Sequence, residues 1–133
     1  MNAKCLLAVS IALLVLLSGC LRTSNGQSGV GTLEGKVTIG PLCPVEPCNI
    51  SAEQMAQVYA GRKIFIYAKD MNTLLKTVDI NADGTYGIEL APGQYIVDTN
   101  HSAVGSVKGA PKLVDITAGK TTKADIEIDT GIR

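Results

Sequence analysis

The chain has 133 residues, with 12 basic and 12 acidic side chains, 14 glycines and no tryptophan. A chain of this length can form one domain with a single modest core. Because the net charge is zero and the basic residues form no cluster, composition gives no electrostatic basis for binding nucleic acid.

Residues 1–19 have the composition of a secretory signal peptide. Lys4 precedes an apolar run from Leu6 to Leu17, and the small residues Ser18 and Gly19 follow it. The run is shorter than the roughly 20 residues that a membrane-spanning helix needs. A cleaved signal peptide is therefore favoured over the alternative, an ordinary transmembrane anchor.

The residues at the end of this run carry a resemblance of their own. Leu17-Ser18-Gly19-Cys20 resembles the lipobox of bacterial lipoproteins, in which the cysteine thiol takes a diacylglycerol and the peptide is cut before it. The resemblance implies lipidation at Cys20 and attachment to the cell membrane or outer membrane, on the extracytoplasmic side. Two or three acyl chains give stable anchoring, where one is marginal. Residues 20–30 are polar and rich in Gly and Ser, which predicts a flexible lipidated linker.

The first predicted strand is followed by a pair of cysteines. Residues 32–40 alternate, with Leu33, Val37 and Ile39 on one face. Cys43 and Cys48 come next, and in an exported chain such a pair is usually a disulfide. The alternatives are weaker, because a redox site needs CxxC at a helix start and a zinc site needs three or four ligands. We therefore predict a Cys43–Cys48 disulfide and no metal site.

A short helix and two further strands follow. Ser51 and Gln54 can form a capping box, which predicts one or two helical turns through Met55, with Met55 packed. Residues 62–69 are apolar on both faces, so we expect a central, well-covered strand. Residues 73–80 form the next predicted strand.

Two tight turns and four strands complete the pattern. Asp83-Gly84 and Pro92-Gly93 are turn signals, and the strands are predicted at 85–90, 94–99, 111–116 and 123–129. Seven short strands over residues 31–133 predict an all-β fold, a seven-stranded antiparallel β-sandwich.

The stretch DINADGTYGIELAPGQYIVD resembles the signature of carboxypeptidase regulatory-like domains, in the transthyretin-like (prealbumin-like) superfamily. The matching positions are Asp83, Gly84, Tyr86, Ile88, Leu90, Pro92, Gly93 and Tyr95. The resemblance implies that residues 31–133 form one such β-sandwich domain. It also implies an accessory module without catalytic residues or cofactors of its own.

Residues that could carry chemistry are sparse. His101, the only histidine, lies beside Asp98 and Ser102 on one predicted loop, whereas a catalytic triad needs groups that converge from a rigid frame. We expect a solvated loop histidine and no catalytic residues. Asn49 and Asn100 match the N-glycosylation acceptor pattern, which matters only if the source organism glycosylates in this way.

These observations favour a non-catalytic binding or structural module of the cell envelope. Its predicted partners are the membrane, through the lipid anchor, and an unidentified envelope protein or glycan. The alternative is a carbohydrate-binding module, which usually stacks sugars on exposed aromatic side chains; Tyr86 and Tyr95 are assigned to the core, which leaves Tyr59 and Tyr67. An enzyme is the third and least favoured function.

Alternation of strand direction predicts where the loops lie. If each strand reverses direction, the loops after the first, third and fifth strands share the end opposite the linker. We expect these three loops to be the long ones, and long loops usually carry binding. The residues predicted to bind are Pro44, Val45, Glu46, Pro47 and His101.

Overall fold

The computed structural model describes residues 29–45 and 47–132. The predicted signal peptide, the lipidation site Cys20, most of the predicted linker and Glu46 lie outside the described residues. Among the residues that are described, no helix is long and apolar enough to cross a bilayer.

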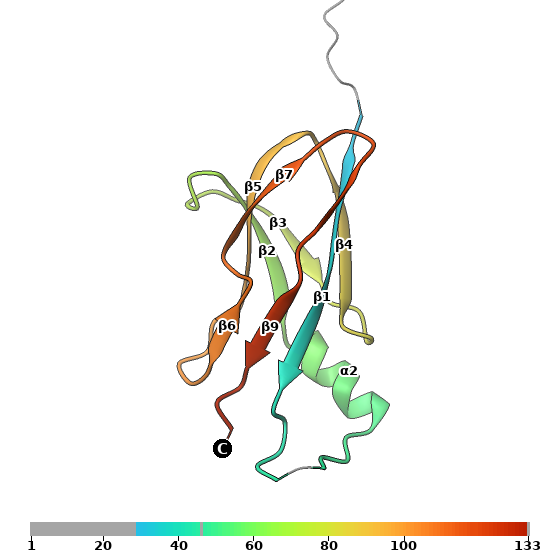
Figure 1. Ribbon diagram of the computed structural model, residues 1–133, viewed down its shortest axis with the longest axis vertical. Coiled ribbons are helices and arrows are strands. Elements are labelled where there is room, and N and C mark those ends of the chain that lie inside the picture. Colours follow the sequence, from blue (N-terminus) through green and yellow to red (C-terminus); the bar gives the residue numbers. More distant parts are fainter. Residues whose placement is uncertain (1–28, 46, 133) are drawn as a thin grey trace, which may run out of the picture.

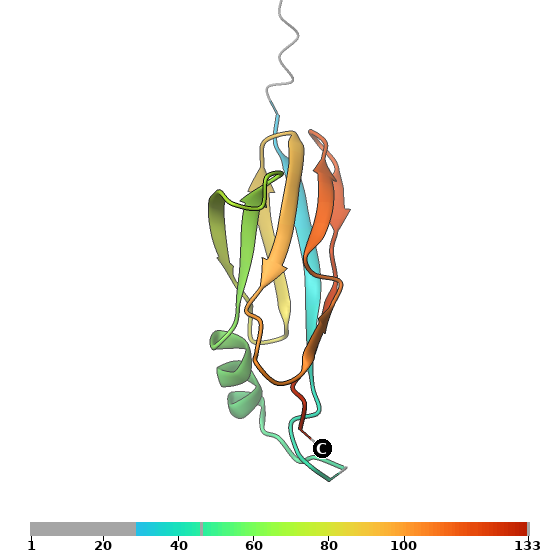
Figure 2. The same cartoon turned by 90° about the vertical axis from the view of Figure 1, so that its left-hand side faces the viewer.

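Two β-sheets pack face to face, with one helix at an end of the sandwich (Figures 1 and 2). The first sheet has the order β4-β1-β9-β6, with β8 also paired to β1, and the second has the order β3-β2-β5-β7. The elements are β1 (Gly31–Gly40), α2 (Ala52–Ala60), β2 (Lys63–Ala68), β3 (Leu74–Asp79), β4 (Thr85–Leu90), β5 (Gly93–Thr99), β6 (Ser106–Lys108), β7 (Lys112–Ile116), β8 (Thr121–Lys123) and β9 (Ile126–Asp129). The prediction of an all-β sandwich is confirmed.

The core lies between the sheets and is built from the inward halves of the alternating strands. Leu33 and Val37 of β1 face Ile64 and Ile66 of β2, and all four side chains are fully buried. The outward partners on β1, such as Lys36, remain exposed. Period-two alternation is therefore what divides each strand between core and solvent.

Strand number and direction differ from the sequence prediction. The described residues form nine strands instead of seven, because β6 forms within the predicted fifth loop and because β8 forms ahead of β9, overlapping the predicted last strand (123–129) only at Lys123. β1 also pairs in parallel with β8 and β9, so the sandwich is not wholly antiparallel. The pairing of the first with the last strands is non-local, and no turn signal in the sequence marks it.

The break between β8 and β9 has a local cause. The backbone N–H of Lys36 donates to the Asp125 carboxylate at 2.8 Å, so a side chain replaces one backbone acceptor of the ladder. The carbonyl of Ala124 accepts from the Tyr86 hydroxyl. A Cβ on Gly35 would lie 2.0 Å from that carbonyl oxygen, so glycine is needed for the two strands to approach here.

Local signals in the sequence are confirmed. Ser51 caps α2, accepting from the Gln54 backbone N–H, while the Gln54 side chain accepts from the Ser51 N–H. The helix is longer than the one or two turns expected. Met55 packs against the core as predicted. Gly84 has a φ of 86° in the β3–β4 turn, as the Asp83-Gly84 pair predicts.

The loops alternate between the two ends of the sandwich (Figure 1). β1 starts at one end, here called the N-terminal end, where the β2–β3, β4–β5 and β7–β8 connections also lie. The segment after β1, the β3–β4 turn and the segment after β5 lie at the opposite end, here called the far end. The predicted distribution of loops is confirmed.

One expectation about β2 is wrong. The strand is central in its sheet, between β3 and β5. Its outward side chains, Phe65 and Tyr67, are only partly buried, and Leu113 on the same face is half-exposed. The apolar residues on the second face of β2 therefore do not mark a strand covered on both sides.

Candidate functional site

The far end carries two loops, residues 41–50 and residues 100–105, here called the far-end loops. They hold the two most exposed large hydrophobic side chains of the described chain, Val45 at 76% and Val104 at 62%. Exposed apolar side chains on loops held by a rigid scaffold are a common setting for recognition. These loops are therefore the candidate binding site.

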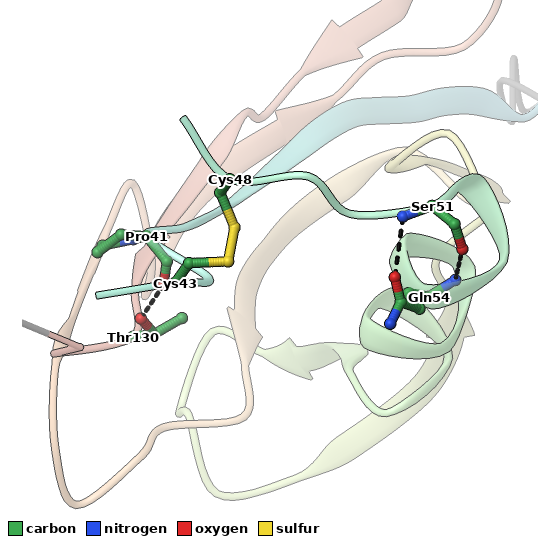
Figure 3. Close-up of a disulfide and its surroundings, with 6 residues drawn as sticks. All are labelled: Pro41, Cys43, Cys48, Ser51, Gln54 and Thr130. Carbon is green, nitrogen blue, oxygen red and sulfur yellow. Dashed lines mark hydrogen bonds between the residues drawn. A yellow bond between two sulfur atoms is a disulfide. The ribbon is translucent and has the colours of Figure 1, made fainter. Parts of the chain in front are cut away.

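The first far-end loop is closed at its base and stapled near its tip (Figure 3). Cys43 and Cys48 form a disulfide, with their Cα atoms 5.7 Å apart. The Thr130 hydroxyl donates to the carbonyl of Pro41, and the Thr130 N–H donates to the carbonyl of Gly40 at 3.1 Å. The loop is therefore held at its base by hydrogen bonds and near its tip by the disulfide.

The helix α2 begins directly after this loop, so its cap fixes where the loop ends. Figure 3 shows the reciprocal hydrogen bonds of Ser51 and Gln54 beside the disulfide. Glu53 lies in the first turn of the helix. Its carboxylate accepts hydrogen bonds from its own backbone N–H and from the Ser51 hydroxyl, and these bonds lower its pKa. A negative charge at this position also suits the positive end of the helix dipole.

The second far-end loop is tied to the start of β2. The Asn100 side-chain oxygen accepts from the Lys63 N–H at 2.8 Å, and its backbone carbonyl accepts from the Arg62 guanidinium at 3.2 Å. The Thr99 hydroxyl donates to the Lys63 carbonyl at 2.8 Å. These bonds hold the base of the loop and leave residues 101–105 exposed.

His101 lies within hydrogen-bond distance of a buried carboxylate. Its Nε2 is 2.8 Å from Oδ1 of Asp98, and the same oxygen accepts from the Thr99 N–H. His101 is exposed on a loop, as expected of a solvated loop histidine, and in addition its imidazole has this carboxylate as a partner. The Ser102 hydroxyl accepts from the Val104 N–H instead of facing the imidazole, which is not the geometry of a triad.

The chain end joins the two far-end loops, which sequence reasoning missed. Thr130 bonds to Gly40 and Pro41 at the base of the first loop. A Cβ on Gly131, whose φ is 75°, would lie 2.6 Å from a methyl carbon of Val104 in the second loop. In the sequence, the only signal of these contacts is the Thr130-Gly131 pair after the last predicted strand. Such a pair occurs in many turns and does not identify its partners.

The predicted binding residues divide between the two loops. Pro44, Val45 and Pro47 lie in the stapled loop and His101 lies in the other, at the same end of the sandwich. Glu46 lies outside the described residues. Tyr59, one of the two tyrosines left available for stacking on sugars, is buried on α2.

The described side chains of the far-end loops carry little charge. His101 is the only titratable group among residues 41–45, 47–50 and 100–105, since the two cysteines are disulfide-bonded. In the described part of the chain, no three His, Cys, Asp or Glu side chains are grouped so that they could hold a metal ion. Recognition at this surface would rest on shape, apolar contact and backbone hydrogen bonds.

A separate hollow of about 530 Å³ lies on the outer face of the first sheet. Gly87 on β4 has no side chain to fill it, and the charged groups around it include Glu34, Lys36, Lys123 and Asp125. Lys123 and Glu34 form an ion pair at 3.7 Å. The hollow is open, and its charges of both signs point to no particular ligand.

Comparisons with known proteins assign the chain to no family. No protein-family model matches the sequence, and no curated protein is significantly similar to it. The chain is similar in structure to the TIE protein of Bacillus anthracis, with a TM-score of 0.49 and 15% identity over 77% of this chain and 17% of that one. It is similar to the minor pilin of Streptococcus agalactiae, with a TM-score of 0.49 and 16% identity over 77% and 45% of the two chains.

A DUF3823 family protein from Parabacteroides merdae is also similar, with a TM-score of 0.42 and 20% identity over 75% of this chain and 46% of that one. This chain spans less than half the length of each of these three proteins. The fold assignment therefore rests on the strands and sheets of the chain itself.

Proposed function

We propose that the protein is a lipid-anchored, non-catalytic binding module of the cell envelope, whose far-end loops engage a partner. In this proposal Cys20 carries the lipid, residues 20–30 are the linker, and the carboxypeptidase regulatory-like sandwich holds the loops away from the bilayer. The observation that carries the proposal is the separation of the two ends. The chain enters the domain at one end, and both far-end loops lie at the other (Figures 1 and 2).

The chemistry of the far-end loops supports binding more than catalysis. Val45 and Val104 are exposed and the loops that bear them are fixed at their bases. Fixing a loop before it binds reduces the conformational entropy lost on association. An apolar, nearly uncharged surface of this kind suits a protein partner of the envelope.

Site-specific photo-crosslinking in intact cells tests this proposal. A photoreactive residue at Val45 or at Val104 should give the same crosslinked partner, because the two loops form one surface. Matched probes at Thr117 and Thr121, at the N-terminal end, should not give it. A partner captured equally from both ends, or only from the N-terminal end, would contradict the proposal.

A second candidate function, glycan binding, is favoured by one observation. Phe65 and Tyr67 are neighbours on the outer face of the second sheet, with ring centroids 6.3 Å apart. Both are partly exposed, and aromatic rings on a flat face can stack against sugars. Affinity electrophoresis with envelope polysaccharides distinguishes the two functions, because retardation that is lost in Tyr67→Ala and kept in Val104→Ala would favour the glycan.

A further inference from the structure

The β2–β3 hairpin has an apolar end that the proposed function does not use. Met71, Leu74 and Leu75 are 43%, 50% and 44% exposed, and they are three of the seven exposed large hydrophobic side chains of the described chain. The β2–β3 pairing shifts register here, because Leu74 pairs with Tyr67 and Lys76 pairs with Ile66, which leaves Leu75 as the extra residue. Both leucines are exposed, so the end of this hairpin is apolar.

Met71 adopts an uncommon backbone conformation. Its φ is 59°, in the left-handed region that glycine and asparagine occupy far more readily, and it is the only non-glycine residue of the described chain there. Asn72 would suit this position better than methionine and lies immediately after it. The strained backbone at an exposed apolar residue of this turn is an observation from which a functional hypothesis can start.

The polar backbone of the same turn is satisfied from within. The N–H of Met71 donates to the Ala68 carbonyl at 2.9 Å, and the N–H groups of Asn72 and Thr73 donate to the Asp70 carboxylate at 3.0 and 3.1 Å. Losing water from these N–H groups would leave none of them unpaired. In a less polar environment these N–H groups therefore add no desolvation cost, provided that the ionised Asp70 carboxylate stays among the polar headgroups, since hydrogen bonds from Asn72 and Thr73 lower its pKa.

The position of the hairpin identifies what that environment is. The hairpin lies toward the end of the sandwich where β1 begins (Figures 1 and 2). Residues 20–28 belong to the proposed linker and precede that point, and a Gly/Ser-rich linker of nine residues would hold its ends about 15–20 Å apart. The exposed side chains of Lys69 and Lys76 flank the apolar residues, as is usual for segments that sit among lipid headgroups.

We propose that the end of the β2–β3 hairpin, with Met71, Leu74 and Leu75, docks into the interfacial region of the bilayer to which the chain is tethered. Docking at the side of the N-terminal end leans the sandwich toward the hairpin and directs the far-end loops away from the lipid. The inference rests on the proposed anchor at Cys20. It adds a second membrane contact, and two contacts hold a domain at a surface better than one.

The two methionines of the chain after Cys20 provide a matched pair of probes. Met71 is at the hairpin, and Met55 is on α2 at the far end. The chain from Cys20 to Arg133, with methyl-labelled methionine, is coupled through the Cys20 thiol to a maleimide lipid in phosphatidylcholine–phosphatidylglycerol nanodiscs. Cys43 and Cys48 do not react because they form the disulfide. A nitroxide-labelled lipid in the disc then broadens any methyl NMR signal that is close to the bilayer.

We expect the Met71 methyl signal to lose intensity at least about fivefold more than the Met55 signal, because a docked hairpin stays next to the nitroxide. The double variant with Leu74→Ser and Leu75→Ser keeps the Met71 probe and removes apolar surface. It should therefore reduce the loss of Met71 signal intensity by about fivefold or more. Val104→Ser, at the far end, should change neither signal. An unchanged Met55 chemical shift in each variant shows that the fold is kept.

Equal losses at the two methyls would overturn the proposal, since the domain would then move freely above the bilayer. A second result would also overturn it. If the Met71 signal shifts with protein concentration in the absence of lipid and keeps its intensity in the presence of the nitroxide, then the hairpin binds a second copy of the chain. Because the anchor is supplied chemically, either result leaves the natural acylation of Cys20 standing. A native chain without acyl mass would contradict the anchor, and the nanodisc result would then describe the hairpin only on a bilayer to which the chain is coupled chemically.

Discussion

At the scale of single residues, Tyr86 links β4 to the segment between β8 and β9, which lies on the other side of β1 in the first sheet. It is buried on β4, and its hydroxyl donates to the carbonyl of Ala124, in the break between β8 and β9. The sequence predicted that Tyr86 points inward, because alternation is a local pattern. It could not predict the partner, because Ala124 is 38 positions away and meets Tyr86 only after β1 pairs with both neighbours.

Removing the Tyr86 hydroxyl should destabilise the domain. Tyr86→Phe leaves the buried Ala124 carbonyl without that donor, and we expect the free energy of unfolding to fall by about 1–3 kcal/mol. Tyr95→Phe is the matched control, since the Tyr95 hydroxyl donates to the exposed Ala91 carbonyl, which water can reach. Urea unfolding of both variants measures the difference, and equal losses would contradict the assignment.

Burial of Tyr86, with a smaller contribution from the Asp125 charge, raises the pKa of its hydroxyl above the ordinary 10.0. Below pH 10 the hydroxyl is protonated in both the folded and unfolded states, so its contribution to stability is complete. Above pH 10 the unfolded chain releases this proton more readily than the folded domain does, and stability falls. We expect Tyr86→Phe to show a shallower decline in stability above pH 10 than the parent protein, as measured by urea unfolding across that range.

At the scale of elements, local signals predicted well and non-local ones did not. The capping box of α2 and the Asp83-Gly84 turn involve neighbours in sequence, and both formed as predicted. The strand β6 and the division of β8 from β9 depend on partners far along the chain. The far-end site shows the same contrast, because its loops were predicted but the Thr130 and Gly131 contacts that join them were not.

Gly35 on β1 and Gly87 on β4 should respond differently to substitution. Gly35→Ala would place a Cβ 2.0 Å from the Ala124 carbonyl oxygen, so we expect a loss of about 2–4 kcal/mol from forced separation of β1 and the β8–β9 segment. Gly87→Ala is the matched control, because its Cβ would meet nothing nearer than 3.7 Å. Similar thermal stabilities of the two variants would show that the close approach at Gly35 is unimportant.

The Cys43–Cys48 disulfide should shape its loop more than it stabilises the domain. It closes a loop of few residues, so chain-entropy arguments give it about 2 kcal/mol at most, and the prolines within the loop lower that. We expect the double variant with Cys43→Ser and Cys48→Ser to lose no more free energy of unfolding than this amount, as measured from the shift of its urea midpoint. A loss above about 4 kcal/mol would mean that the loop supports the core.

At the scale of the whole molecule, strand alternation was enough to assign each loop to an end. The reason is physical, since short connections reverse the chain and the order of strands then determines where each loop lies. The separation of the N-terminal end from the far end follows from that order. The ligand does not follow from it, because an apolar surface whose described residues include one titratable group, His101, matches many partners.

The measurement that tests the central claim most directly is the intact mass of the protein extracted from its own membranes. Both the display of the far-end loops and the docking of the hairpin depend on a lipid anchor at Cys20. We predict a chain that begins at Cys20, contains the Cys43–Cys48 disulfide and carries added acyl mass on its first residue. A chain that begins at another residue, or one that begins at Cys20 without acyl mass, would contradict the anchored arrangement.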